Sequence, residues 1–486
     1  RITEFDNYSE MKEALDKANI HFEAAVFDTC LSATIEVADA LSNHCNYMIA
    51  SEEVLYGGCL GYSKWISAIS QNPNWTGADL GKMIGPIYRS KMAEIGNESE
   101  YTMSTVDLTK IGDLKKAFSA MASKMNAATQ NVTSFKNLVK VGSRVQKYGA
   151  ASPLEGYTNL IDLADFAKNA SSEVPNEAAI LINEIKKAVV WEGHGSGKSK
   201  SNGIAVYYPV KYQQEGDEYA KTTNNKEYLR YLDTILDDWT APSWVYSDAR
   251  ARSVTPTKSK DYKVEYETYF TESDDGTYFT LEITSGKEIV STVDFTLYWY
   301  DEENNEYCYL GMDNDIAYDL DNENIYYDNF NAEWITLGNS YVCAEIIEES
   351  DTENVYSIPV ELNGKETNLR VRYILDRDQF IVLGAYDGLE NGASSKGMRK
   401  LKNGDKIRLI YPTYNAETDE DLEYTDTKVY TWNGHNKIQY SELNEGIYLY
   451  QFTVTDIFGN YYDSDYTTIN YDGREFYFEE VDYDAE

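Results

Sequence analysis

The most constraining feature of this sequence is a change of pattern near residue 240. Before that point, stretches with helical spacing alternate with short apolar runs, whereas after it short β-rich segments are separated by turn signals. The charge changes at the same place, because residues 1–240 hold 31 acidic and 24 basic residues and residues 241–486 hold 51 and 19. We therefore predict two architectures, joined by a linker over 241–260 where prolines and small polar residues gather.

The pattern of the first part, residues 1–240, predicts an α/β fold. Short apolar runs of the kind buried in parallel sheets are separated by stretches whose apolar residues recur at helical spacing. Strands separated by helices predict a mostly parallel sheet with helices on both faces. The predicted elements are a helix at 9–18, a strand at 22–27, a helix at 31–41, a strand at 47–50, helices through most of 62–190, a last strand at 203–210 and a helix at 225–239.

The second part is predicted to be all β. Its β-rich segments are separated by turn pairs such as Asn363-Gly364 and Asp472-Gly473. Such spacing is typical of β-sandwiches, and we predict two sandwich-like modules, over 261–365 and 366–486. The clearest predicted strands are 293–300, 368–376, 406–414 and 446–456.

The charge balance excludes whole classes of partner. The 486 residues include 82 acidic and 43 basic ones, for a net charge of −39. Phosphate recognition needs concentrated Lys and Arg, so neither nucleic acid nor an anionic membrane surface is an expected partner. No apolar run is long enough to predict a membrane span. The chain begins at Arg1 without a signal peptide, as expected for a processed product.

The five cysteines do not form the pattern of a disulfide scaffold or a zinc site. They are few and scattered, no CxxC pair occurs, and the four histidines lie far apart in the sequence. Cys45 with Cys59 and Cys308 with Cys343 could form disulfides, or all four could be buried thiols.

One cysteine stands where catalytic groups gather in α/β proteins. The predicted strand at 22–27 is followed by Asp28-Thr29-Cys30, and a helix is expected to begin at once. Functional groups collect at the carboxyl ends of strands, and the partial positive charge of a helix N-terminus favours a thiolate, the nucleophilic form of cysteine. Taken alone, this cysteine is more often a structural core residue than a nucleophile.

The surrounding residues resemble a known family. Phe27-Asp28-Thr29-Cys30-Leu31, followed by Ala33–Ala38, closely resembles the nucleophile segment of the clostripain family of cysteine peptidases. Further landmarks in the family's order are Ile49–Glu53, Gly61-Tyr62 with Trp65, Ser201–Pro209 and Asp456–Asn460. The resemblance implies a caspase-like α/β fold and peptide-bond hydrolysis through a thioester on Cys30, whose backbone amide helps to hold the oxyanion.

The resemblance also implies a Cys/His dyad whose histidine precedes the cysteine on a neighbouring strand. Only His21 precedes Cys30, and at about 3.3 Å per residue it lies about 30 Å away, too far to act as a base. His194 lies in a His-Gly setting but follows the nucleophile, and we expect it in a solvent-facing glycine loop. That loop also contains Lys198, but Glu192 stands where a P-loop needs glycine, so nucleotide binding is not expected. Enzymes of the family that the chain resembles mature into a light chain that carries the histidine and a heavy chain that carries the cysteine. By that resemblance we expect the catalytic histidine on a separate light chain, released by self-cleavage after a basic residue upstream of Arg1.

Substrate preference is expected to depend on Asp28. A carboxylate two residues before the nucleophile can select Arg or Lys before the scissile bond, through a charge-assisted hydrogen bond. The alternative is that Asp28 caps the following helix. The resemblance implies a second pocket acid after the Ser-Glu segment, but residues 55–60 contain none and only Glu52 and Glu53 lie nearby. The preference between Arg and Lys is therefore left open.

An acidic stretch in the second part is a candidate calcium site. It offers many oxygen ligands but lacks EF-hand spacing, so a solvated acidic face is the alternative. The oxygen-bearing residues are Asp313, Asn314, Asp315, Asp319, Asp321 and Glu323. No cofactor is required by any other pattern in the sequence.

Two functions follow from these observations. The first is a secreted or cell-surface bacterial endopeptidase acting after Arg or Lys, with the nucleophile on this chain and the histidine on a light chain. The alternative is a non-catalytic surface binding protein, with a degenerate peptidase core and tyrosine-rich β modules that recognise a partner.

Overall fold

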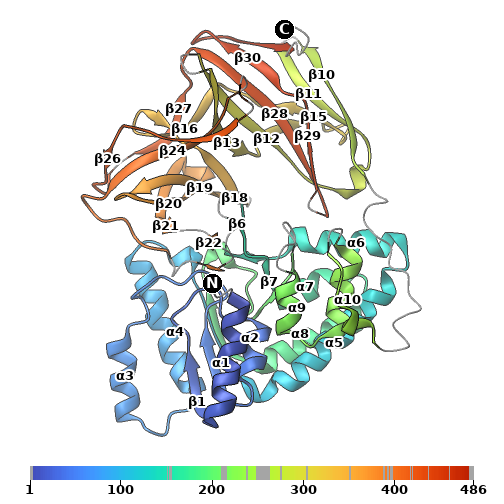
Figure 1. The fold of residues 1–486 in the computed structure, drawn as a ribbon, viewed down its shortest axis with the longest axis vertical. Helices are drawn as coiled ribbons and strands as arrows, with labels where there is room; N and C mark the ends of the chain where they lie inside the picture. Colours follow the sequence, from blue (N-terminus) through green and yellow to red (C-terminus); the bar gives the residue numbers. More distant parts are fainter. Residues whose placement is uncertain are drawn as a thin grey trace. The chain divides into compact units, whose positions relative to one another are not determined.

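The chain forms two units. The first comprises the described residues within Arg1–Ala151, Gly156–Asp261 and Gly388–Arg399, and the second those within Ser152–Glu155, Tyr262–Asp387 and Lys400–Glu486. Figure 1 shows helices around a sheet in the first unit and strands throughout the second. The computed structural model describes residues 4–149, 151–152, 156–209, 216–236, 239–247, 263–273, 276–302, 305–349, 352–386, 389–390, 393–394, 398–415, 418, 420–435, 437–458 and 460–480.

The central sheet of the first unit has the strand order β1-β2-β3-β8. These strands are β1 (Phe22–Val26), β2 (Cys45–Ala50), β3 (Thr102–Asp107) and β8 (Val189–His194). β1 and β2 are parallel, whereas β3 is antiparallel to both of its neighbours. The prediction of a mostly parallel sheet is therefore wrong for the described strands. One α-helix lies between the parallel strands β1 and β2, whereas two lie between β2 and β3. The chain therefore enters β3 from the opposite end of the sheet, and β3 runs antiparallel to β2.

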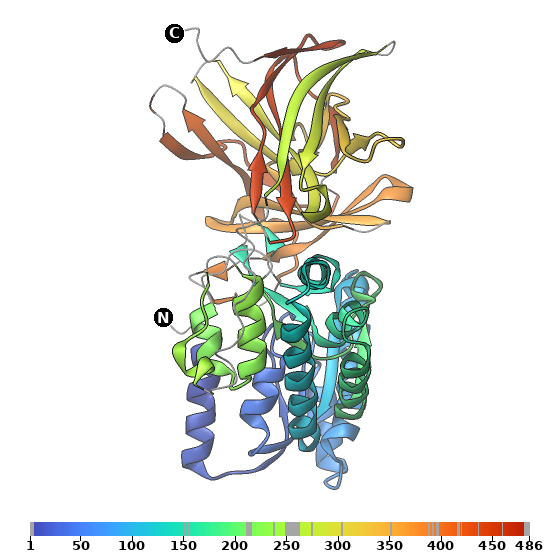
Figure 2. The same ribbon diagram turned by 90° about the vertical axis from the view of Figure 1, so that its right-hand side faces the viewer.

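Helices cover the two faces of this sheet (Figures 1 and 2). α4 packs closely on one face, where a Cβ on Gly81 or Gly85 would collide with Thr105 or Trp191. The helices predicted at 9–18 and 225–239 are present as α1 and α10, although α1 begins earlier, at Glu4, and α10 ends earlier, at Ile235. The helices are α1 (Glu4–Ala18), α2 (Ile35–Leu41), α3 (Tyr62–Gln71), α4 (Gly77–Glu94), α5 (Ile111–Ala128), α6 (Val132–Arg144), α7 (Leu163–Ala170), α8 (Pro175–Ala188), α9 (Gly216–Thr222) and α10 (Lys226–Ile235).

The strand predicted at 203–210 is real but belongs to another sheet. β9 (Ala205–Tyr207) pairs with β7 (Leu160–Asp162), which pairs with β4 (Lys147–Tyr148). The backbone N–H of Ala205 also donates to the carbonyl of Ala33, 2.8 Å away. An apolar run predicts burial but not the partner strand, and here the partner is a short strand that the sequence did not suggest.

The second unit consists mainly of strands that form three sheets. The largest has 13 described strands, and the others are β10-β11-β15-β14 and β17-β16-β27. Phe279 of β11 stacks on Phe452 of β28, so side chains of two of the sheets pack against each other. The strands are β10 (Glu265–Ser273), β11 (Gly276–Ser285), β12 (Val290–Asp301), β13 (Glu306–Asp313), β14 (Ile316–Tyr318), β15 (Ile325–Asp328), β16 (Glu333–Leu337), β17 (Ser340–Tyr341), β18 (Ala344–Glu349), β19 (Glu353–Leu362), β20 (Lys365–Ile374), β21 (Gln379–Tyr386), β24 (Lys406–Asn415), β25 (Glu420–Thr425), β26 (Tyr430–Thr431), β27 (Ile438–Glu442), β28 (Gly446–Asp456), β29 (Tyr461–Asp463), β30 (Thr467–Tyr471) and β31 (Phe476–Glu480).

The four strands predicted most clearly are confirmed as parts of β12, β20, β24 and β28, although the one predicted at 368–376 ends two residues earlier, at Ile374. The predicted boundary at residue 365 is wrong. Asn363 and Gly364, with φ of 57° and 82°, form a two-residue turn that joins β19 to β20. β12 pairs along its length with β28, which lies beyond the predicted boundary. The turn signal therefore marks a hairpin inside one sheet rather than a junction between two modules.

The predicted linker also begins too early at residue 241. Val245 is fully buried, and its carbonyl accepts a 2.7 Å hydrogen bond from Arg230 of α10. Tyr246 bonds to Asp233 of the same helix. The apolar side chains of this segment outweigh the proline signal and hold it on the first unit. Residues 248–260 lie outside the described residues.

A buried carboxyl group predicts how stability depends on pH. Glu36 lies in α2, where Tyr219 donates a 2.8 Å hydrogen bond to it, and burial raises the pKa of Glu36 from 4.5 to about 7. The folded state therefore binds this proton more tightly than the unfolded state, so the free energy of unfolding should fall as pH rises from 4.5 to 7. The loss is about 3 kcal/mol at most.

Glu36→Gln should remove this loss, because an amide still accepts from Tyr219 but cannot ionise. We expect the variant to have a higher Tm than the parent at pH 8 and a similar Tm at pH 5, measured by thermal unfolding. The matched control is Glu13→Gln, at a carboxylate that is 65% exposed and paired with Lys17 on the surface. Equal Tm differences for both variants at both pH values would contradict the prediction.

Candidate active site

The nucleophile segment forms a tight turn between β1 and α2. Asp28 and Thr29 are exposed, whereas Cys30 is only 4% exposed. The Ser32 hydroxyl donates to the carbonyl of Cys30 at 3.0 Å, and Leu31 adopts a left-handed conformation with φ of 57°. Thr34 caps α2 through the backbone N–H of Val37. The prediction that a helix begins directly after Cys30 is therefore wrong, because these hydroxyls stabilise a turn before Ile35.

A second segment, Ser51–Leu55, lies beside this turn and contacts the thiol. The backbone N–H groups of Ala33 and Leu31 donate to the carbonyls of Ser51 and Glu53, at 2.9 and 3.3 Å. The N–H of Leu55 points to Cys30 Sγ at 3.2 Å. An N–H donor at sulfur stabilises a thiolate, so this contact replaces the helix N-terminus expected from the sequence.

Asp28 is oriented by Tyr62, a role that the sequence does not indicate. The Tyr62 hydroxyl, at the start of α3, donates to Asp28 Oδ2 at 2.6 Å. Partial burial and this hydrogen bond raise the pKa of Tyr62 to about 12. The alternative in which Asp28 caps α2 is wrong, because Thr34 does so. An exposed carboxylate at the carboxyl end of β1 remains available to a cation.

Glu52 and Glu53, the acids nearest the missing second pocket residue, both point into the interior. They are 1% and 3% exposed. Burial and the nearby Asp162 raise the pKa of Glu52, which shares a hydrogen bond with Asp162, and burial raises the pKa of Asp162 to about 6. Asp162 accepts hydrogen bonds from Asn202 and from the first turn of α7. Neither glutamate therefore lines an exposed pocket.

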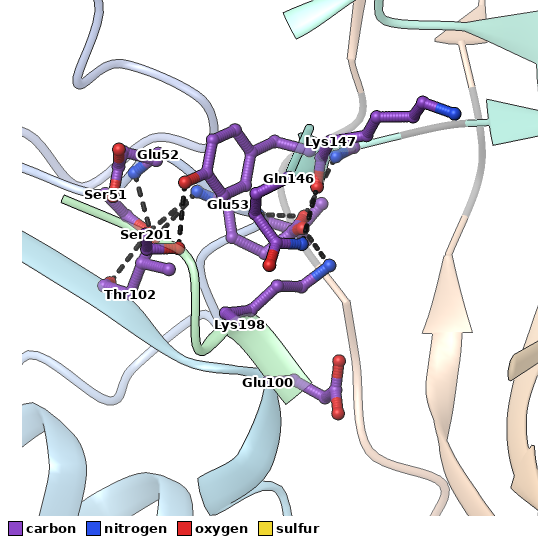
Figure 3. A network of polar contacts seen from close by, with 12 residues as sticks. Ser51, Glu52, Glu53, Glu100, Thr102, Gln146, Lys147, Lys198 and Ser201 are labelled. Carbon is purple, nitrogen blue, oxygen red and sulfur yellow. Dashed lines mark hydrogen bonds and ion pairs between the residues drawn. The ribbon is translucent and has the colours of Figure 1, made fainter. Parts of the chain in front are cut away.

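Glu53 forms an ion pair with Lys198 (Figure 3). Lys198 Nζ lies 2.8 Å from Glu53 Oε2, and both side chains are buried. The expectation of a solvent-facing glycine loop is wrong for Gly195 and Lys198, which are buried, although Ser196 and Ser199 are exposed. A Cβ on Gly195 would collide with the carbonyls of Glu98 and Ser99, so the glycine lets the loop pack inward. No spacing in the sequence distinguishes this lysine from a surface lysine.

Three histidines of the first unit bind other groups. His21 contacts Asn46 at 2.9 Å and His44 contacts Asp16 at 2.7 Å, while His194 pairs with Glu192 at 2.9 Å. His194 ends β8, three strands from β1, which is about 14 Å at the usual strand spacing. His435 belongs to the second unit. Where the structure places them, these three side chains therefore do not supply the imidazole of a catalytic dyad with Cys30.

Two of the predicted calcium ligands accept hydrogen bonds from other groups. Asp319 accepts hydrogen bonds from the backbone of Asp321 and Asn322, and the buried Asp313 accepts one from Tyr356. In the part of the chain that the structure describes, no three His, Cys, Asp or Glu side chains converge to hold a metal. The calcium site therefore stays a prediction. The five cysteines are buried and are not in disulfides.

No described helix has the length and apolarity needed to cross a membrane.

Met398, far along the sequence, belongs to the first unit and accepts a hydrogen bond of 2.7 Å from Tyr56, the residue after Leu55. The residue that follows the Ser51–Leu55 segment therefore contacts a residue more than 300 positions further along the chain.

Comparison with known proteins places the chain in a family. Curated protein sequences give no match. Similar solved structures include a clostripain from Bacteroides thetaiotaomicron in complex with a peptide inhibitor (16% identity, TM-score 0.34, 46% of this chain and 93% of that chain). Others are a B. fragilis cysteine protease (15%, 0.33, 46% and 94%) and an inactive zymogen of a C11 protease from Parabacteroides distasonis (17%, 0.35, 45% and 61%). The clostripain family profile matches residues 3–250, just over half of the sequence. The chain therefore belongs to the clostripain family of cysteine peptidases.

Proposed function

We propose that this chain carries the nucleophile of a secreted or cell-surface endopeptidase, of caspase-like fold, that cleaves after Arg or Lys. The observation that carries the proposal is the arrangement at the end of β1. Cys30 Sγ accepts the N–H of Leu55 at 3.2 Å, and the exposed Asp28, held by Tyr62, stands two residues earlier. A thiol beside a donor and a carboxylate free to bind a cation suit covalent hydrolysis of a basic substrate.

The reaction would proceed through a thioester on Cys30. A histidine removes the thiol proton, Sγ attacks the carbonyl carbon, and the same imidazole protonates the leaving amine. The backbone N–H of Cys30 and that of a glycine beside the histidine would hold the oxyanion. Water then hydrolyses the thioester. Because Cys30 is only 4% exposed, we expect side chains around the thiol to move when substrate binds.

The histidine would come from a light chain that adds a strand beside β1. Among the described strands, β1 pairs only with β2, and its Phe22 is 44% exposed. In α3, all of which is described, no side chain is fully buried, and Ile66 and Ile69 are 50% and 36% exposed. Apolar strands of parallel pairs are normally covered on both sides. A strand added at this edge would lie about 4.8 Å from β1, so a histidine at its end would reach Cys30.

The test combines the chain with the polypeptide encoded upstream of it. We expect an arginyl or lysyl acyloxymethyl ketone to attach covalently to Cys30 in this complex, as detected by intact mass and peptide mapping. In the full precursor, Cys30→Ala should leave one uncleaved polypeptide. If the complex resists labelling and the variant is cleaved normally, the proposal is wrong, and a binding protein with a degenerate core becomes the better account.

A further inference from the structure

We propose that Lys198 and Glu53 are positioning residues for Cys30, joined in a buried ion pair that holds the Ser51–Leu55 segment against the nucleophile. This inference rests on the proposed function, because it assigns the pair a role in the same reaction. Neither residue contacts the reacting atoms. The pair acts on the backbone that does.

Both carboxylate oxygens of Glu53 have partners. Its Oε2 pairs with Lys198 Nζ at 2.8 Å, while Oε1 accepts the backbone N–H groups of Val54 and Gly149 at 2.7 and 3.1 Å. Both oxygens are therefore engaged, and the side chain is nearly inaccessible to water. A buried carboxylate needs such compensation, and losing the lysine would leave a buried negative charge without its counter-ion.

The backbone connects Glu53 to the nucleophile turn and to the thiol. Its carbonyl accepts the N–H of Leu31, the residue after the nucleophile, at 3.3 Å. Two residues further along, the N–H of Leu55 lies 3.2 Å from Cys30 Sγ. Leu31 is left-handed, a conformation that persists in a non-glycine residue only when its surroundings impose it. The contact from Glu53 is one of those constraints.

Lys198 belongs to the loop that follows β8. Lys198 ends the short helical turn Ser196–Lys198, and this loop is anchored by a 2.8 Å hydrogen bond from the N–H of Gly195 to the carbonyl of Tyr101. The ion pair thus connects the loop after β8 to the residues around Cys30. A shift of Lys198 would release Glu53 and let the donor at Leu55 move away from the sulfur.

The experiment compares Lys198→Met and the neutral double variant Lys198→Met/Glu53→Gln with the parent chain. The control is Lys187→Met, which breaks a surface ion pair with Glu184. Two readouts are used: the rate of Cys30 alkylation by iodoacetamide against pH, measured by peptide mass spectrometry, and kcat and KM on an arginyl peptide in complex with the histidine-bearing polypeptide. Thermal unfolding shows whether each variant is folded.

We expect Lys198→Met to slow Cys30 alkylation about tenfold at pH 7, to move the alkylation curve to higher pH and to lower kcat at least tenfold, with KM within twofold. The double variant should lose about threefold in both rates, because the amide keeps the backbone hydrogen bonds without a buried charge. It decides the question if the single variant does not fold. Parental alkylation and kcat in a folded variant, or a rise in KM alone, would overturn the inference. If the parent complex does not hydrolyse peptides, the proposed function fails, while the alkylation rates still decide the role of the pair.

Discussion

Cys30→Ala is expected to lower kcat/KM on arginyl and lysyl peptides by at least about 10,000-fold in the complex with the histidine-bearing polypeptide. The reason is that the thioester cannot form without Sγ, and only binding and oxyanion contacts would remain to assist attack by water. Initial rates on fluorogenic peptides measure the loss. Because the side chain is small and lies in a turn rather than in a helix, the variant should stay folded.

The control for this prediction is another buried thiol of the same unit. Cys45 begins β2 and donates to the carbonyl of Tyr47, 3.0 Å away. Cys45→Ala should keep kcat/KM within threefold of the parent. The assignment of Cys30 would be contradicted by a Cys30→Ala variant that retains activity, or by equal losses in the two variants.

Local pattern was sufficient to predict the elements that carry the site. The run predicted at 22–27 contains β1 (Phe22–Val26), and Tyr47–Ala50 lies in β2. Asp28 and Cys30 follow β1 at its carboxyl end. These features depend on residues adjacent in the sequence, where apolar run length and turn composition act directly. The prediction that a helix follows Cys30 failed because Ser32 and Thr34 hold a turn, an interaction that helical spacing does not encode.

Long-range pairing could not be predicted in the same way. The reversal of β3, the separate sheet of β9 and the pairing of β12 with β28 depend on contacts between distant residues. The burial of Lys198 is the clearest case for the site. Lysine is almost always a surface residue, and only the three-dimensional placement of Glu53 makes its burial favourable.

The preference for peptides with Arg or Lys before the scissile bond is expected to depend on Asp28. Asp28→Asn should lower kcat/KM for arginyl and lysyl peptides by about 100- to 1,000-fold, because a charge-assisted hydrogen bond to the cationic side chain is lost. The loss should fall mainly on peptides with a basic residue before the scissile bond. Alkylation of Cys30 by iodoacetamide, which carries no charge, should stay within twofold. A panel of peptides that differ only in that residue measures the change in preference.

Tyr62→Phe is the matched variant, because it keeps the carboxylate and removes only the hydroxyl that donates to Asp28 at 2.6 Å. We expect a loss of less than tenfold on the same peptides, since the carboxylate is less firmly oriented but still charged. A graded series, with Tyr62→Phe between the parent and Asp28→Asn, would identify the carboxylate rather than the shape of the turn as the source of selectivity. Strong cleavage after apolar residues by the parent complex, with none after Arg or Lys, would remove Asp28 from the substrate site. The exposed carboxylate would then serve only to accept the Tyr62 hydroxyl and tie the end of β1 to the start of α3.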